Sequence, residues 1–464
     1  MESIKSGYKL KRSKILIISL MLFPLIGNTT SLIDVYEDAL VNDPLLKEAL
    51  ANKEAISEFR PQARSLLLPQ INATGSYSDS DVNGKSTFQQ QTAIGTVTNT
   101  TGFLQESETT QWEVSIRQTI FDFGAWMTLK KANKTVAQSE IDYLAAEQAL
   151  MVRVATAYFN VLAAQDTLES EQAARQAIEK QLDQSRKRFD VGLIAITDVQ
   201  EAQAAYDQSI ANEIIAKRNL ATSKESLRAI TDNYPSNLLK PDNNLPLIMP
   251  NPQSETEWVN ISLEQNLNFL SAQLGTEIAR SEVKVQRSGH FPTIGVQAQK
   301  RETVSDSFRS DSGGDFNPAD TENINEGIGV QVTVPIFSGG QTSSRVRQAV
   351  AQHRATKEKL ERVGRETTRN ARDSYLGVIS GIATVKALQQ SVKSSATALQ
   401  ATEAGYEVGT RTTVDVLDAR RRLYSSQRNL AVSKYDYLKN IIQLKQAAGT
   451  LSKDDLVQIN NWLK

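Results

Sequence analysis

The sequence predicts a mainly α-helical chain with a membrane β-barrel portion, built from a duplicated unit of one β-hairpin and one very long helical hairpin. Residues 125–231 contain no proline and a single glycine, Gly192, which is the composition of a helical hairpin that turns once. The stretch 188–202 matches the stretch 405–419 and pairs Gly192 with Gly409, so this hairpin occurs twice. Segments of strict apolar–polar alternation precede each long helix, and such alternation is typical of membrane-spanning strands.

The amino terminus has the pattern of a secretory signal peptide. Basic residues from Lys5 to Lys14 precede an apolar run at residues 15–27. This run is too short for a mature transmembrane helix, so we assign residues 1–30 to a signal peptide with an approximate cleavage site. The chain has no cysteine, which excludes a disulfide scaffold, a thiol nucleophile and a lipid-modified cysteine.

The first repeat, residues 31–230, should contain a pair of strands near residues 69–78 and 111–121. In the second of these segments Trp112, Val114 and Ile116 alternate with polar residues. Strands with an apolar exterior and a polar interior are the units of a transmembrane barrel. The polar stretch 79–110 between the two strands should form a long outer loop.

The first helical hairpin should follow directly and reach far from the sheet. Its first arm runs from Gly124 to a tip at Gly192, about 65 residues, which corresponds to a rod of roughly 100 Å. Ordinary helices are about a dozen residues long, so arms of this length must lie side by side in a coiled-coil-like bundle. A proline-rich connection, residues 231–256, should then join the repeats over the surface.

The second repeat, residues 257–464, should copy the first. We expect strands near residues 291–300 and 327–337, a polar loop at 301–326, and a hairpin tip at Gly409. Four strands in one chain cannot close a barrel, and open sheet edges do not occur in hydrocarbon. Two copies would give eight strands, and a barrel of eight has an interior filled by side chains, so at least three copies should contribute strands to one water-filled barrel. The strand count does not separate a trimer from a tetramer.

Nothing in the sequence indicates catalysis. The two histidines, His290 and His353, stand in unrelated contexts, and we expect neither a cofactor nor a metal site. Acidic and basic residues are nearly equal in number, 53 and 52, and spread along the chain, so no nucleic-acid partner is indicated.

Four motifs carry a resemblance that covers essentially the whole mature chain. They are RSLLLPQ (64–70), ATAYFNVLAAQD (155–166), QLDQSRKRFDVGLIAITDVQ (181–200) and AGYEVGTRTTVDVLDA (404–419). With these motifs the chain resembles the TolC family of outer-membrane channel-tunnel proteins.

The resemblance implies a homotrimer with a 12-stranded barrel in outer-membrane lipid and an α-helical tunnel that crosses the periplasm of a Gram-negative bacterium. It also implies an exit duct for multidrug efflux and type I protein secretion. An inner-membrane pump or exporter would recruit this duct through a periplasmic adaptor.

The resemblance further assigns three groups of residues at the hairpin tips. Asp415 and Asp418 would form two acidic rings at the periplasmic constriction, although a role in helix capping alone would also suit such residues. Glu201 would add an acid near the gate that the family lacks. Contacts that hold the gate shut would involve Gln181, Thr197, Asp198, Tyr406 and Arg411, and the adaptor would dock on Val191, Gly192, Leu193, Val408, Gly409 and Thr410.

Two other classes of protein remain as alternatives. A general outer-membrane diffusion channel would consist almost entirely of strands, many more than four. A periplasmic coiled-coil structural or adaptor protein would have helical hairpins without strands that are apolar on their outer face.

Overall fold

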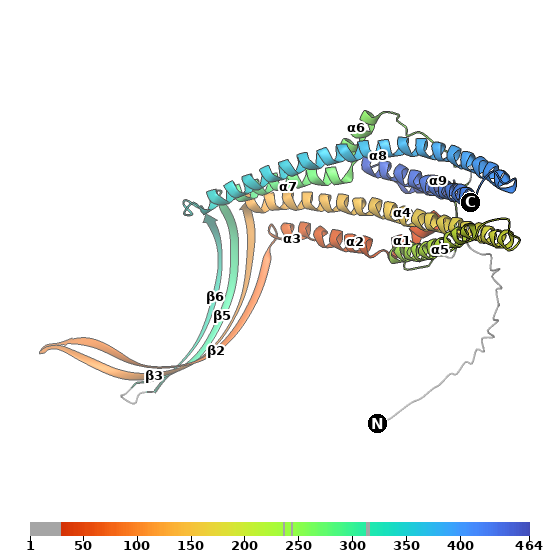
Figure 1. The fold of residues 1–464 in the computed structure, drawn as a ribbon. Coiled ribbons are helices and arrows are strands. Elements are labelled where there is room, and N and C mark those ends of the chain that lie inside the picture. Colours follow the sequence, from red (N-terminus) through yellow and green to blue (C-terminus); the bar gives the residue numbers. More distant parts are fainter. Residues whose placement is uncertain (1–28, 235–236, 243–244, 312–315) are drawn as a thin grey trace, which may run out of the picture.

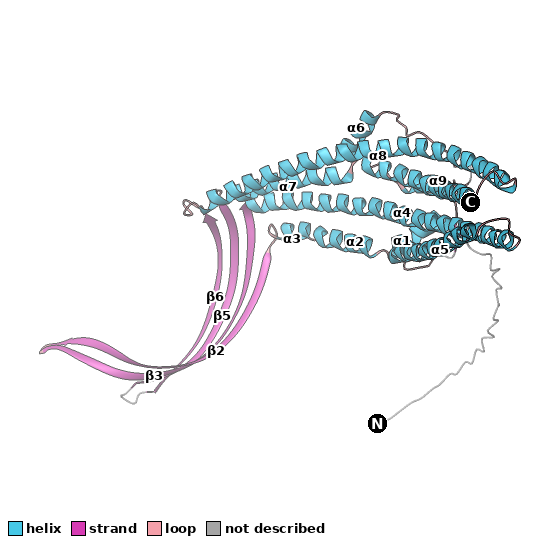
Figure 2. Ribbon diagram, viewed as in Figure 1, coloured by secondary structure: helices cyan, strands magenta, loops and turns pink. Residues whose placement is uncertain are grey.

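The computed structural model describes residues 29–234, 237–242, 245–311 and 316–464. The predicted signal peptide therefore lies almost entirely outside the described residues. The molecule has two parts, a curved sheet at one end and a long body of helices that extends away from it (Figures 1 and 2).

The sheet consists of two hairpins side by side. Its strands are β2 (Gln70–Thr92), β3 (Gly95–Asp122), β5 (Thr293–Asp311) and β6 (Phe316–Thr333), in the order β2-β3-β5-β6. All three pairings are antiparallel, and the β3–β5 pairing joins the hairpin of one repeat to that of the other. β2 and β6 have no further neighbour among the described strands, so both edges of the sheet are open.

The strands are much longer than predicted. Residues 79–110 and 301–326, predicted as polar loops, continue the strands: the first hairpin is paired out to Thr92 and Gly95. The prediction was wrong here because a ladder needs only backbone hydrogen bonds, and polar side chains do not prevent it. β6 also ends at Thr333, short of the predicted 337, where Pro335 cannot donate to the ladder.

Large apolar side chains of β6 are uncovered in the single chain. Ile328, Val330 and Val332 are exposed by 80%, 70% and 59%. They alternate with Gly329 and Gln331, so they share one face of the strand. The predicted apolar exterior of this strand is therefore present in the structure.

Two long helical hairpins form the body. α4 (Phe123–Asp190) and α5 (Ile196–Thr231) make the first, which we call the outer hairpin. α8 (Gln341–Glu407) and α9 (Thr413–Ala448) make the second, which we call the inner hairpin. α4 begins directly after β3, where the Asp122 carboxylate accepts a hydrogen bond from the Ala125 N–H at 3.1 Å. The predicted turns near 192 and 409 are confirmed.

Shorter helices extend the short arm of each hairpin toward the sheet. α5 and α9 have 36 residues each, about half the length of α4 and α8. α2 (Pro44–Ser57) and α3 (Phe59–Ser65) pack along α4 nearer the sheet, and α7 (Leu267–Ser288) packs between α4 and α8 (Figure 1). Among the described residues, no helix is long and apolar enough to cross a membrane.

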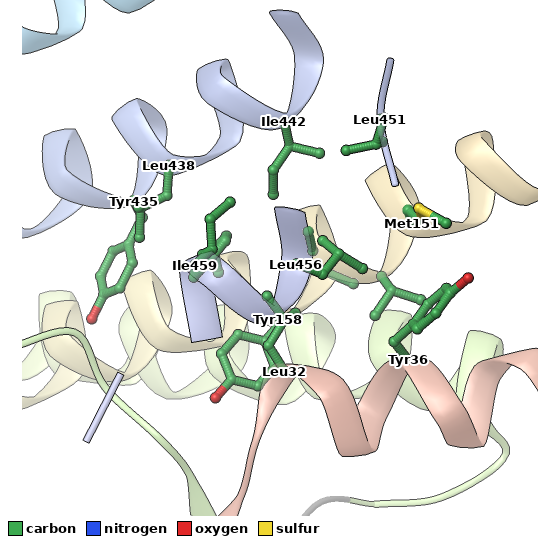
Figure 3. Close-up of a cluster of buried hydrophobic side chains, with 14 of the residues drawn as sticks. Leu32, Tyr36, Met151, Tyr158, Tyr435, Leu438, Ile442, Leu451, Leu456 and Ile459 are labelled. Atoms are coloured by element: carbon green, nitrogen blue, oxygen red, sulfur yellow. The ribbon is translucent and has the colours of Figure 1, made fainter. Parts of the chain in front are cut away.

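The main core lies in the middle of the body. It gathers residues of α1 (Leu32–Asn42), α4, α9 and α10 (Lys453–Asn460), among them Tyr158, Leu438 and Leu456 (Figure 3). The proline-rich connection contributes Leu245 to this core, so it is more than a surface link, and α6 (Glu255–Gln265), which begins at its end, contributes Trp258. Its β4 (Asn237–Leu238) pairs with β1 (Thr29–Thr30), and the Tyr158 hydroxyl donates to the Leu239 carbonyl at 2.8 Å. The core leaves the two hairpin tips free at the end far from the sheet.

Candidate functional site

The two hairpin tips have the same turn. Gly192 and Gly409 adopt φ of 77° and 79°, a left-handed conformation that favours glycine. After each glycine the chain closes on the end of the long helix: the Leu193 N–H donates to the Arg188 carbonyl at 2.9 Å, and the Thr410 N–H donates to the Gly405 carbonyl at 2.8 Å. The two repeats that match in sequence therefore also form tips with the same backbone geometry.

The tips present apolar side chains to solvent. Val191, Leu193 and Val408 are exposed by 69%, 72% and 76%. Thr410 is exposed as well. Uncovered apolar groups clustered beside a turn are typical of a surface that a partner covers.

The two tips differ in how the returning helix begins. Thr412 caps α9 in a capping box, in which the Asp415 carboxylate accepts from the Thr412 N–H at 2.9 Å and from its hydroxyl at 3.0 Å. The matching residue in the outer hairpin is Ala195, which has no side chain that could cap α5. The sequence comparison missed this asymmetry, although the Thr–Ala exchange is visible in the aligned repeats.

Asp415 thus has the capping role that was its alternative interpretation. The hydrogen bonds from the Thr412 backbone and side chain, together with the charge of Arg411, hold the pKa of Asp415 below its ordinary value. The carboxylate therefore stays ionised at neutral pH while it caps the helix. Asp418, three residues on, shares its face of α9 and is about half exposed. Capping and a negative charge at the tip are compatible.

Tyr406 lies between the two hairpins. Its side chain is buried, and the Arg188 guanidinium of α4 stacks over its ring at 4.5 Å from the ring centroid. Its hydroxyl accepts from the Thr413 hydroxyl of its own hairpin at 3.3 Å. Arg188 is the contact that sequence reasoning missed, because a residue that stacks on a ring carries no motif of its own.

The contacts that the resemblance implied for Tyr406 and Arg411 are not made within the single chain. Gln181 is buried, and its side-chain N–H₂ has no hydrogen-bond partner among the described residues. Arg411 is exposed, as is Thr197, and Asp198 is half-buried; no hydrogen bond joins Arg411 to either in the described part of the chain. Glu201 is exposed on α5, three residues after Asp198.

Other contacts tie α9 to the outer hairpin above the tip. Leu417 of α9 packs into an apolar cluster of the outer hairpin that includes Leu182 and Ala202. The Arg420 guanidinium donates to the Glu403 carboxylate at 2.8 Å and also to the Ala177 carbonyl of α4. Arg420 replaces Gln203 of the first repeat, so the comparison of repeats could have found it.

The described residues contain no group of three or more acidic residues or histidines placed to hold a metal ion. The tips combine exposed apolar side chains with charged groups. Such a surface can bind a partner.

Comparisons with known proteins agree with this architecture. The model of the family described as outer membrane efflux protein matches residues 35–233 and 258–450. Outer membrane protein TolC of Vibrio cholerae is 35% identical over 436 residues, 94% of this chain and 94% of that protein. Outer membrane protein TolC of Escherichia coli is 36% identical over 452 residues, 96% of this chain and 87% of that protein.

A secretion protein is also similar. The alkaline protease secretion protein AprF of Pseudomonas aeruginosa is 30% identical over 432 residues, 92% of this chain and 85% of that protein. Among solved structures, the outer membrane protein VceC of Vibrio cholerae superimposes with a TM-score of 0.71 at 19% identity, and covers 90% of this chain and 96% of VceC. The Campylobacter jejuni outer membrane channel CmeC gives a TM-score of 0.69 at 19% identity, with 92% and 89% covered. These likenesses between structures concern the fold.

Proposed function

Because the chain belongs to the outer membrane efflux protein family, we propose that it is an outer-membrane exit duct of a Gram-negative bacterium. It serves multidrug efflux and type I protein secretion; the matched family is named for efflux, and the relative AprF for the secretion of a protease. Those names describe efflux and secretion, and we propose no catalytic role. One observation carries the proposal: a four-stranded sheet with open edges and an exposed apolar face continues into helical hairpins roughly 100 Å long.

The assembly that fits this chain is a homotrimer. The free edges of β2 and β6 must be paired in hydrocarbon, and three copies would close a barrel of 12 strands. About 9–11 residues of a tilted strand cross a bilayer. The alternating apolar segments next to the helices would therefore lie in the membrane. The polar outer halves of β2 and β3 would project beyond it.

The helical end would be the gate. The Arg188–Tyr406 stack joins the inner hairpin to the outer hairpin of the same chain. Arg411 would pair with Thr197 and Asp198 of the adjacent copy, and Gln181 would gain its missing partner in the same closed assembly. A stack of this kind is worth about 0.5–2 kcal/mol. Three symmetric copies would form a closure that a partner can still open.

The exposed apolar tips would be the docking surface for a periplasmic adaptor. Val191, Gly192 and Leu193 of the outer hairpin and Val408, Gly409 and Thr410 of the inner hairpin would contact it. An inner-membrane pump or exporter would act through this adaptor. Asp415 and Asp418 would lie at the narrowest part of the duct.

Thiol labelling of intact cells tests the orientation that the proposal requires. The chain has no cysteine, so Ile94→Cys at the β2–β3 turn and Val408→Cys at the inner tip each introduce one reactive site. Both positions are well exposed, by 100% and 76%. A membrane-impermeant maleimide should label Ile94→Cys in intact cells and Val408→Cys only after the outer membrane is permeabilised. Labelling of Val408→Cys from outside would reverse the topology and exclude the duct.

A further inference from the structure

Three consecutive arginines follow Asp418 on α9. Arg420, Arg421 and Arg422 stand where the first repeat has Gln203, Ala204 and Ala205. The basic run is therefore specific to the inner hairpin, like Tyr406 and Arg411.

The three side chains do not share one role. Arg420 is mostly buried and engaged by Glu403 and Ala177. The Arg421 side chain is 56% exposed, and its guanidinium lies 3.6 Å from the Asp418 carboxylate. Arg422 is exposed and stands four residues after Asp418 and seven after Asp415. These spacings place Asp415, Asp418 and Arg422 on one face of the helix.

We propose that Arg421 and Arg422 form a basic ring directly inside the acidic rings of Asp415 and Asp418, so that the entrance of the duct is balanced in charge. This inference rests on the proposed function, because it requires that this face of α9 lines the conduction path. In a trimer, six carboxylates would be followed by six guanidinium groups. Such an entrance admits anionic solutes as well as cations, and it resists block by multivalent cations.

The acidic and basic rings lie close enough together for their electric fields to cancel. Along a helix axis Arg422 lies about 6 Å beyond Asp418. This is shorter than the screening length of about 8 Å at physiological ionic strength, so the two fields overlap at the same point of the path. The neighbouring face of α8 does not restore a negative potential: from Ser394 to Gln400 its exposed side chains are Ser, Ala, Thr and Gln, and the carboxylate of Glu403 is paired with Arg420.

Planar-bilayer recordings of the purified trimer test the inference. Arg421→Gln with Arg422→Gln removes the basic ring, and Arg421→Lys with Arg422→Lys keeps its charge. In a tenfold KCl gradient, the current through the wild type and through the lysine variant should reverse at a voltage near zero. The reversal potential of the glutamine variant should shift toward the potassium equilibrium potential. When hexamminecobalt(III) is added at the helical end, half-block of this variant should require about tenfold less of the cation than half-block of the wild type.

The matched control adds the same charge to the other hairpin. Ala204 is the exposed counterpart of Arg421 on α5, and Ala204→Arg should leave both the reversal potential and the block unchanged. A change as large as that of the glutamine variant would show that any charge near the tips acts at long range. That result would overturn the specific role of Arg421 and Arg422.

Two further variants separate this inference from the proposed function. If Asp415→Asn with Asp418→Asn shifts selectivity toward anions but the glutamine variant matches the wild type, the basic ring is excluded and the duct stands. If neither variant changes selectivity, this face of α9 does not line the conduction path. That result would exclude the basic ring and also the proposed place of Asp415 and Asp418 at the narrowest part of the duct. Arg422→Cys in this cysteine-free chain should respond in opposite directions to a cationic and an anionic methanethiosulfonate, and no response to either would also overturn the inference.

Discussion

At the scale of single residues, Asp43 connects two helices of the body. It caps α2 by accepting from the Leu46 N–H at 2.8 Å, and it receives two hydrogen bonds from the Arg153 guanidinium of α4 at 2.8 and 2.9 Å. Burial by itself would raise the pKa of Asp43, but the Arg153 and backbone hydrogen bonds bring that pKa below its ordinary value. The carboxylate therefore stabilises the fold while it is ionised.

This pKa shift predicts a pH-dependent contribution to stability. Because the folded-state pKa is depressed, the contribution is fully present above the ordinary carboxyl pKa of about 3.9 and is lost as the pH falls through the lower folded-state pKa. Asp43→Asn keeps a good cap but loses the charge, and should lower the free energy of unfolding by about 1–2 kcal/mol at pH 7. Asp43→Ala should cost about 1 kcal/mol more because the cap is lost too.

Urea denaturation followed by circular dichroism measures both variants. The difference between wild type and Asp43→Asn should shrink as the pH is lowered from 5 toward 3. A difference that does not change with pH would mean that the Arg153 ion pair does not set the pKa.

At the level of residues, the sequence identified which side chains at the tips are distinctive, but it predicted only some of their contacts. The alignment of repeats singled out Tyr406 because Phe189 replaces it in the first repeat. Its packing against Arg188 depends on how two helices lie against each other, which no pattern within either helix specifies. The capping role of Asp415 was predicted as its alternative interpretation, and Thr412, three residues before it, completes the capping box.

At the scale of elements, glycine marks the helix ends for two different reasons. A Cβ atom at Gly409 would meet no other described atom within 4 Å, so only the φ of 79° requires glycine there. Gly449 ends α9 with a φ of 76°, and a Cβ there would also overlap the carbonyl of Gln265 at the end of α6. The two positions share a conformation and differ in their surroundings.

This difference predicts unequal effects of the same substitution. Gly409→Ala should lower the free energy of unfolding by about 1–2 kcal/mol, the cost of a left-handed conformation. Gly449→Ala should cost at least about 3 kcal/mol, because the backbone of α6 must also move. The heat-induced dissociation of each variant, followed on gels and by circular dichroism, measures this order. Equal losses at the two positions would contradict the close approach of α6 to α9.

The elements themselves were predictable wherever side-chain periodicity determines them. Exclusion of proline and glycine located the outer hairpin and its tip, and the sequence repeat located the inner hairpin. The lengths of β2 and β3 were not predictable, because beyond the apolar segments the strands are held by backbone pairing alone. The shorter helices α2, α3 and α7 likewise depend on packing against α4 and α8, and the sequence does not specify how these helices are placed in space.

At the scale of the whole molecule, one chain is an incomplete object. Its sheet has two open edges, its tips expose apolar side chains, and Gln181 is buried with an unpaired donor among the described residues. Each of these features would be resolved by neighbouring copies or by a partner. The central claim is that the assembled duct is shut at its helical end by contacts of the inner hairpin with the outer hairpins.

Single-channel conductance of the purified trimer in planar bilayers tests this claim most directly. Arg188→Gln with Arg411→Ile removes the stack on Tyr406 and the cation proposed to reach the adjacent copy. Lys187→Gln with Lys393→Gln removes two exposed charges from the same long helices, α4 and α8, and serves as the control. The first variant should assemble normally and conduct several-fold better than wild type, while the control should match wild type. A normally assembled first variant with wild-type conductance would show that the duct is not closed at this site.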